Sequence, residues 1–309
     1  MIDTMRRIGE LEVSVAGLGC NNFGMRIDEG ATQTVVDAAI ETGINFFDTA
    51  DLYGGTKSEE FLGRVLGSRR DDVLLATKFG MLKPPEDSGL TGGKPAWVAQ
   101  ACEDSLRRLG TDRIDLYWLH APDPETPIGD TLEALDQLVR DGKVRELGCS
   151  NFSAAQLDEA AAAAKEHGVR PFATVQNDYS LLQREPEKEV LPACARLGIA
   201  FVPYFPLASG LLTGKYKRGE TPPEGTRLAQ WGAPSDDRFA VVERLDAFAT
   251  AHGHTLHELA LSWLARRPEV ASVIAGATKP EQVRANAAAT TAWDLTDDEL
   301  AEVDTLTAT

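Results

Sequence analysis

The feature that most constrains the fold is a unit of a short apolar run, a turn and an amphipathic segment, which recurs along most of the chain. The runs are almost continuously apolar, which is typical of parallel strands buried on both faces. Strands that alternate with helices need right-handed crossovers, and these build a parallel sheet. The predicted strands cover residues 15–20, 44–50, 73–79, 114–120, 144–150, 172–177, 199–204 and 270–276.

Eight strand–helix units favour a closed barrel over an open sheet, which usually has fewer strands. An open doubly wound sheet that binds a dinucleotide carries the spacing G-x-G-x-x-G after its first strand. Here the glycines are Gly17, Gly19 and Gly24, and the third comes too late. The sequence of 309 residues therefore predicts one α/β domain, a (β/α)8 TIM barrel over residues 1–309.

Three stretches depart from the repeating unit. Residues 5–14 have the pattern of a β-hairpin that turns at Gly9 and Glu10, ahead of the barrel. Long loops follow the third strand (residues 80–95) and the seventh strand (residues 206–234). Such loops are uncommon in compact domains unless they serve a site. Because both follow strands, we expect them at the face where barrels place their active sites.

Composition excludes several kinds of partner. A formal charge of −17 would repel DNA or RNA. The four cysteines form no C-x-x-C pair, which favours reduced thiols over a disulfide framework. The N-terminus has no apolar signal core, and no apolar run approaches the length of a membrane span. We expect a cytoplasmic protein that contacts no membrane, and a monomer, because no exposed apolar stripe indicates an interface.

Ionisable side chains end three consecutive predicted strands. Asp48 closes the second strand, Lys78 the third and His120 the fourth, while Tyr53 follows Asp48 by one short loop. Barrels bring such strand ends to one mouth, so we expect the four side chains to meet there. A buried carboxylate and a buried ammonium are costly unless paired, which predicts an Asp48–Lys78 ion pair. One such residue alone is more often a cap, a surface group or a packed side chain; the joint placement indicates an active site.

These residue types suit carbonyl reduction, in which a hydride reaches carbon while a proton reaches oxygen. A phenol has an ordinary pKa of about 10. We expect the ammonium of Lys78 to lower the pKa of Tyr53 and make it a proton donor near neutral pH. Asp48 would keep Lys78 charged, and His120 would position the carbonyl oxygen by a hydrogen bond.

Longer motifs cover nearly the whole chain. They are FFDTADLYGGTKSEEFLG, VLLATKFG, RIDLYWLHAPD, GKVRELGCSNFS, TVQNDYSLL, PYFPLASGLLTGKY and IAGATKPEQVRANAAA. With them the chain resembles the aldo-keto reductase family, which implies the same barrel and a nicotinamide cofactor bound without a Rossmann fold. In that family the first three motifs hold the catalytic tetrad, here Asp48, Tyr53, Lys78 and His120.

The resemblance also implies how the later motifs bind the cofactor. Ser150, Asn151 and Gln176 would hydrogen-bond the nicotinamide carboxamide, and Tyr204 would stack on the ring. The segment implied to run along the pyrophosphate, with a lysine as a point charge, consists of Phe205, Pro206, Leu207, Ala208, Ser209 and Lys215.

The motif after the eighth strand bears on the choice of cofactor. A helix N-terminus favours an anion, and the resemblance places the adenosine 2′-phosphate there. The residues implied are Gly276, Thr278, Lys279 and Gln282, with Asn286 at the adenine. More basic versions of the motif have an arginine where this chain has Gln282, and a lysine with a glutamine holds a dianion less firmly. We expect NADPH in preference to NADH.

The substrate pocket is defined less well by the sequence. The family's use of the loop after the first strand suggests Asn22 and Phe23, and the other long loops suggest Phe79, Met81 and Trp231. Ordinary loop anchoring is the competing interpretation of each. An apolar pocket with one polar focus would suit aldehydes and ketones broadly.

Three histidines, His252, His254 and His257, crowd within HGHTLHE. No carboxylate or cysteine constellation accompanies them in the sequence, so we predict a solvated helix start and no metal site.

Two other functions compete with carbonyl reduction. The same family includes β subunits of potassium channels, which bind NADPH and act largely as partners, and the tetrad does not separate the two roles. The short stretch before the hairpin disfavours a channel-tethering role. A barrel lyase or isomerase could use Lys78 as a Schiff-base nucleophile, but that explains neither Tyr53 nor the motif at Lys279. We predict NADPH-dependent reduction of a small carbonyl compound, reversible in principle.

Overall fold

The computed structural model describes residues 4–81, 91–222, 228–229 and 235–308. Its centre is a parallel sheet in the order β10-β3-β4-β5-β6-β7-β8-β9. Each strand falls on one of the predicted apolar runs. The strands are β3 (Ala16–Gly19), β4 (Phe46–Asp48), β5 (Leu74–Phe79), β6 (Ile114–Leu119), β7 (Val144–Ser150), β8 (Thr174–Asp178), β9 (Ala200–Tyr204) and β10 (Val273–Gly276).

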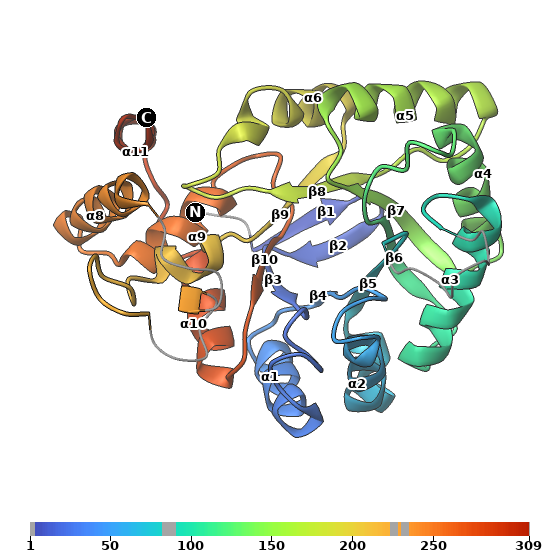
Figure 1. Cartoon of the computed structure of the whole chain (residues 1–309), viewed down its shortest axis with the longest axis horizontal. Coiled ribbons are helices and arrows are strands. Elements are labelled where there is room, and N and C mark those ends of the chain that lie inside the picture. Colours follow the sequence, from blue (N-terminus) through green and yellow to red (C-terminus); the bar gives the residue numbers. More distant parts are fainter. Residues whose placement is uncertain (1–3, 82–90, 223–227, 230–234, 309) are drawn as a thin grey trace.

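The sheet closes into a barrel between β9 and the segment that leads into β10. The Phe201 N–H donates to the carbonyl of Glu269 (2.7 Å), and the Ala271 N–H donates to the carbonyl of Phe201 (2.9 Å). Figure 1 shows the strands at the centre of the molecule and the helices around them. The prediction of a (β/α)8 TIM barrel is confirmed.

Several of the helices begin or end at residues that favour those positions. At α5, Ser153 and Gln156 form a capping box at the start, and Gly168 takes the left-handed conformation after the last turn. The helices are α1 (Glu29–Glu41), α2 (Lys57–Leu66), α3 (Pro95–Leu109), α4 (Ile128–Arg140), α5 (Ala154–His167), α6 (Val190–Leu197), α8 (Asp236–Ala251), α9 (Leu256–Ala265), α10 (Pro280–Thr290) and α11 (Asp297–Thr307).

Apolar side chains fill both sides of the sheet. The larger cluster lies between strands and helices, and a smaller one, which includes Phe46 and Trp118, fills the barrel. Trp118 pairs with Gly148 on the neighbouring strand, where an added Cβ would overlap the indole ring. A glycine at this position therefore lets the largest side chain of the interior fit.

The hairpin predicted before the barrel is formed by β1 (Met5–Ile8) and β2 (Leu11–Ser14). Ile8, Leu11 and Val13 are buried in the same cluster as the barrel interior. Asn45, just before β4, donates from Nδ2 to the carbonyl of Glu12 (2.9 Å). The hairpin therefore covers the end of the barrel where the strands begin, and the opposite end is left for a site.

The long loops expected after the third and seventh barrel strands follow β5 and β9. The described part of the second includes the 3-10 helix η3 (Ala208–Thr213). Within the described residues, the longest and most apolar helices fall short of what a membrane crossing requires.

Candidate active site

Three neighbouring strands carry ionisable residues to the open end of the barrel. Asp48 is the last residue of β4, Lys78 is the second-last residue of β5, and His120 follows β6. The register pairs Asp48 with Ala76 and Lys78 with Trp118, so each of the three residues lies two positions further along its strand than the one before it.

Tyr53 reaches the same place from the loop after β4. Its N–H donates to the carbonyl of Ala50 (3.2 Å), and its carbonyl accepts from the N–H of Ser58 in α2 (3.2 Å). These bonds hold the loop against the first turn of the helix. The Tyr53 hydroxyl lies 3.3 Å from Nζ of Lys78. The structure thus brings together the four residues that the sequence selected.

Asp48 and Lys78 form a buried ion pair. The ammonium of Lys78, which has no exposed surface, donates to Oδ2 of Asp48 and to the carbonyl of Thr49 (2.8 Å). Gln176 Nε2 donates to the other carboxylate oxygen (3.1 Å). Burial opposes the charge of Lys78, but Asp48 and Tyr53 outweigh it and raise the pKa of the lysine. Lys78 is therefore an ammonium at neutral pH.

The acidity of Tyr53 differs from the expectation. Burial raises the pKa of the phenol above its ordinary value of 10.0; Lys78 opposes this rise and Asp48 adds to it. The prediction of a lowered pKa is wrong for this structure, because the loss of hydration outweighs the nearby ammonium. Tyr53 is consequently protonated at neutral pH, which is the form that a proton donor needs.

His120 meets Tyr53 edge to face, with 6.0 Å between the ring centroids. Burial, with a contribution from the Lys78 charge, lowers the pKa of His120 to about 3. Its Nδ1 is buried and has no hydrogen-bond partner among the described residues. The imidazole is therefore neutral near pH 7, and a neutral imidazole can donate one hydrogen bond to a carbonyl oxygen.

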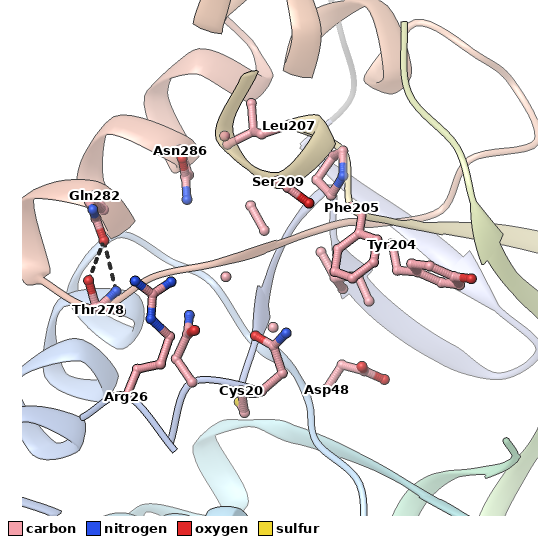
Figure 2. A pocket seen from close by; sticks show the side chains of 18 of the residues that line it. Cys20, Arg26, Asp48, Tyr204, Phe205, Leu207, Ser209, Thr278, Gln282 and Asn286 are labelled. Carbon is pink, nitrogen blue, oxygen red and sulfur yellow. Dashed lines mark hydrogen bonds between the residues drawn. The ribbon is translucent and has the colours of Figure 1, made fainter. Parts of the chain in front are cut away.

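A cavity of about 790 Å³ lies at this end of the barrel, within the range of small-molecule and cofactor sites (Figure 2). Asp48, Tyr53 and His120 line it, whereas Lys78 is buried behind them. The other predicted residues that line it are Ser150, Asn151, Gln176, Tyr204, Phe205, Pro206, Leu207, Ser209, Lys215, Gly276, Thr278, Lys279, Gln282 and Asn286.

Hydrogen bonds join the ends of β7, β8 and β9 into a polar wall of the cavity. Ser150 Oγ donates to the carbonyl of Gln176 (2.8 Å), and Asn151 Nδ2 donates to the carbonyl of His120 (2.9 Å). The Tyr204 hydroxyl donates to Oδ1 of Asn151 (2.8 Å). The wall is thereby tied to the strand end that carries the histidine.

Backbone strain gathers around the cavity. Among the described residues, non-glycine residues with positive φ are Thr56 and four near the cavity: Asn151 (64°), Phe205 (53°), Ala208 (46°) and Ser209 (60°). Such conformations cost of order 1–3 kcal/mol each and cluster at ligand sites. Ala208 does not itself line the cavity, but it belongs to the strained segment that carries Phe205 and Ser209.

Helix α10 begins at the opposite end of the cavity from Tyr204 (Figure 2). Gln282 Oε1 accepts from the N–H of Thr278 (2.8 Å) and from its hydroxyl (3.2 Å). Lys279 and Gln282 are exposed, and Asn286 is buried one turn further along. This turn offers N–H groups, a lysine and two amides to a ligand.

The five residues predicted to line the substrate pocket do not all lie at the cavity. Asn22 and Met81 line the cavity. Trp231 lies outside the described residues.

The placement of Phe23 and Phe79 at the substrate pocket is wrong. Both are completely buried in the cluster between strands and helices. Phe79 follows Lys78 on β5, and successive side chains of a strand point to opposite faces. Its ring stacks on Tyr117, with 4.7 Å between the centroids. Phe23 bridges to Ile27 in a tight loop that turns its ring inward.

The cavity residues that were missed include a histidine and an arginine. His257, interpreted as part of a solvated helix start, is half-buried, and its Nε2 lies 2.9 Å from Oδ1 of Asn286. Arg26 lines the cavity from the loop between β3 and α1. Its place after the first strand was a usable signal, because such loops lie at the active-site face of a barrel. No comparable signal marks His257, which lies in the first turn of α9.

The arrangement of an ion pair, a phenol and a neutral imidazole around a large cavity agrees with a family match. Residues 16–308 match the model described as "Aldo/keto reductase family". The chain belongs to this family. Together with its relatives, the match makes the protein an oxidoreductase of the aldo-keto reductase type.

Individual relatives agree with the family match. The chain is 36% identical to "Uncharacterized oxidoreductase YrpG" of Bacillus subtilis (strain 168), over 89% of this chain and 86% of that protein. It is 34% identical to "Probable aldo-keto reductase 1" of Glycine max, over 89% of this chain and 80% of the relative. The solved structure of the glycerol dehydrogenase AKR11B4 from Gluconobacter oxydans superposes with a TM-score of 0.86 at 32% identity, covering 99% of this chain and 95% of the other.

Proposed function

We propose that this aldo-keto reductase reduces an aldehyde or a ketone to an alcohol with NADPH. The observation that carries the proposal is the Tyr53 hydroxyl, which lies 3.3 Å from the Lys78 ammonium in the wall of a cavity that His120 also lines. A phenol with a cation beside it and a hydrogen-bond donor opposite suits proton transfer to a carbonyl oxygen.

The cavity residues fit a dinucleotide. Asn22 is 3% exposed and lines the cavity, and its Oδ1 has no partner among the described residues, so it offers an acceptor to a ligand. A Cβ at Gly276 would lie 3.1 Å from Nδ2 of Asn22, so the glycine keeps that passage open. Ser150, Asn151 and Gln176 would hold the nicotinamide carboxamide, Tyr204 would stack on the ring, and Thr278, Lys279 and Asn286 would hold the adenosine end. The bound cofactor supplies the hydride.

Each tetrad residue has a separate task. Tyr53 donates its proton to the carbonyl oxygen, and the Lys78 ammonium stabilises the phenolate that remains. Asp48 keeps Lys78 charged and oriented through their ion pair. His120, as a neutral imidazole, positions the carbonyl oxygen by a hydrogen bond.

The environment of Lys78 disfavours one of the two competing functions. A Schiff-base role needs a neutral, accessible amine, whereas Lys78 has no exposed surface and is paired with Asp48. A cofactor-binding partner subunit would have the same tetrad, so turnover is the property that separates it from an enzyme.

The deciding experiment combines cofactor binding with turnover. We expect the purified protein to change the fluorescence of NADPH and to oxidise NADPH with a nitrobenzaldehyde. Glyceraldehyde should be tested as a second carbonyl substrate, because one solved relative is named a glycerol dehydrogenase. Binding without turnover of any carbonyl compound would favour the partner subunit, and absence of binding would refute both cofactor-dependent functions.

The pKa shifts predict how the rate depends on pH. Reduction needs protonated Tyr53, whose pKa is raised by burial, so kcat/KM should stay level from about pH 6 to about pH 9. The reverse oxidation needs the phenolate and should accelerate with rising pH. Because the pKa of His120 is lowered to about 3, its titration should not change the rate near neutral pH. A fall in the rate below about pH 6.5 that disappears in His120→Gln would contradict this assignment.

A further inference from the structure

The turn that would hold the 2′-phosphate of NADPH is short of positive charge. Gln282 is neutral, and its amide oxygen already accepts two hydrogen bonds from Thr278. Arg284 pairs with Glu41 (2.8 Å) and does not line the cavity. Along the described turn and helix from Gly276 to Thr290, Lys279 is the cation that lines the cavity.

A second cation reaches this end of the cavity from a different segment. Arg26, in the loop between β3 and α1, is exposed and lines the cavity together with Thr278, Lys279 and Gln282. In Figure 2 its guanidinium points toward Thr278 and Gln282. An arginine is thus present in space at the place where Gln282 replaces one in the sequence motif.

Hydrogen bonds fix the position of the Arg26 backbone. The Arg26 N–H donates to the carbonyl of Asn22 (2.8 Å), which also accepts from the N–H of Ile27 (3.1 Å). The side chain of Asn22 is buried and donates from Nδ2 to the carbonyl of Ala277 (3.1 Å). Two bonds therefore connect the Arg26 backbone to the residue that precedes Thr278, and from this position the guanidinium reaches the same end of the cavity.

We propose that Arg26 binds the 2′-phosphate of NADPH and is the main determinant of its preference over NADH. The inference rests on the proposed function and names the residue that discriminates between the two cofactors. A guanidinium is always charged and offers two parallel N–H donors to phosphate oxygens. The phosphomonoester carries nearly two negative charges at neutral pH. Because the protein has a net charge of −17, a local cation is needed to offset the overall repulsion.

The test is the variant Arg26→Gln, which removes the charge and keeps a polar side chain. We expect its Kd for NADPH, from fluorescence titration, to rise about 10- to 100-fold, and its Kd for NADH to change by less than about twofold. Competition with fragments gives a readout that does not depend on turnover. The affinity of 2′,5′-ADP should fall by the same factor as that of NADPH, and the affinity of 5′-AMP should not change. Arg26→Lys should retain part of the preference.

The matched control is Arg284→Gln, which removes a neighbouring arginine that pairs with Glu41 outside the cavity. Its Kd for NADPH should stay within about twofold of the wild-type value. An unchanged Kd for NADPH in Arg26→Gln, or an equal loss for NADPH and NADH, would overturn the proposal, with thermal melting used to verify folding. A wild-type protein that reduces carbonyls with NADH alone would refute the role of Arg26 and leave the reductase standing. Absence of binding to either cofactor would refute both.

Discussion

Tyr53→Phe should abolish carbonyl reduction and leave cofactor affinity almost unchanged. The ring is kept, and with it the edge contact to His120 and the position of Lys78 Nζ, 5.0 Å from the ring centroid. The proton donor alone is lost, and general acid catalysis contributes about 10²- to 10⁴-fold to a rate. We expect kcat/KM for a nitrobenzaldehyde with NADPH to fall by that factor, and the Kd for NADPH to stay within about twofold.

A second tyrosine provides the control for this variant. Tyr117 is fully buried, stacks on Phe79 and does not line the cavity. Tyr117→Phe removes a hydroxyl of the same kind and should keep wild-type turnover. If Tyr53→Phe remained active, or if both variants lost activity equally, the proton donor would have to lie elsewhere.

Lys78→Met should cost both stability and activity. It leaves the carboxylate of Asp48 buried without its cation, although Gln176 still donates a hydrogen bond to it. Breaking a buried ion pair on one side costs about 3–5 kcal/mol in the free energy of unfolding. A loss of this size should lower Tm by about 10 °C. Turnover should fall at least as far as in Tyr53→Phe, because a phenolate at Tyr53 would then have no cation beside it.

The double variant Asp48→Asn/Lys78→Met separates the two losses. It removes both buried charges, so much of the lost stability should return, while activity should stay absent. Lys143→Met is the matched control, because Lys143 pairs with Glu103 at the surface and such pairs contribute about 0–1 kcal/mol. A Lys78→Met protein that melts like the wild type would show that the buried pair is not what holds this part of the barrel.

The strands could be predicted from the sequence because burial on both faces leaves continuous apolar runs. The hairpin at residues 5–14 was predictable in the same way, from two short strands around Gly9. The packing between strands could not be predicted. The fit of Trp118 over Gly148 depends on the register of two strands whose pairing no local pattern specifies.

The meeting of Asp48, Lys78 and His120 was predictable because topology alone carries them to one mouth of the barrel. The assignment of Phe79 failed because it ignored the alternation of side chains next to Lys78. The direction of the pKa shift of Tyr53 could not be predicted from the sequence, because it depends on the balance between burial and the charge of Lys78. The place of Arg26 after the first strand was a usable signal for the active-site face, but its reach toward Thr278 depends on loop bonds through Asn22 that no sequence pattern specifies.

Among the described residues, the hairpin closes the end of the barrel where the strands begin. The buried side chains of Ile8, Leu11 and Val13 fill this end of the barrel. The cofactor, the carbonyl compound and the alcohol would therefore all pass through the opposite end. For the proposed reductase, a dinucleotide held between Arg26 and Tyr204 would lie in this cavity and would form one side of the space in which the smaller molecule reacts. Molecules that use the same opening have to bind and leave in sequence. We therefore expect a compulsory order, with the dinucleotide first to enter and last to depart, and the alcohol released before it.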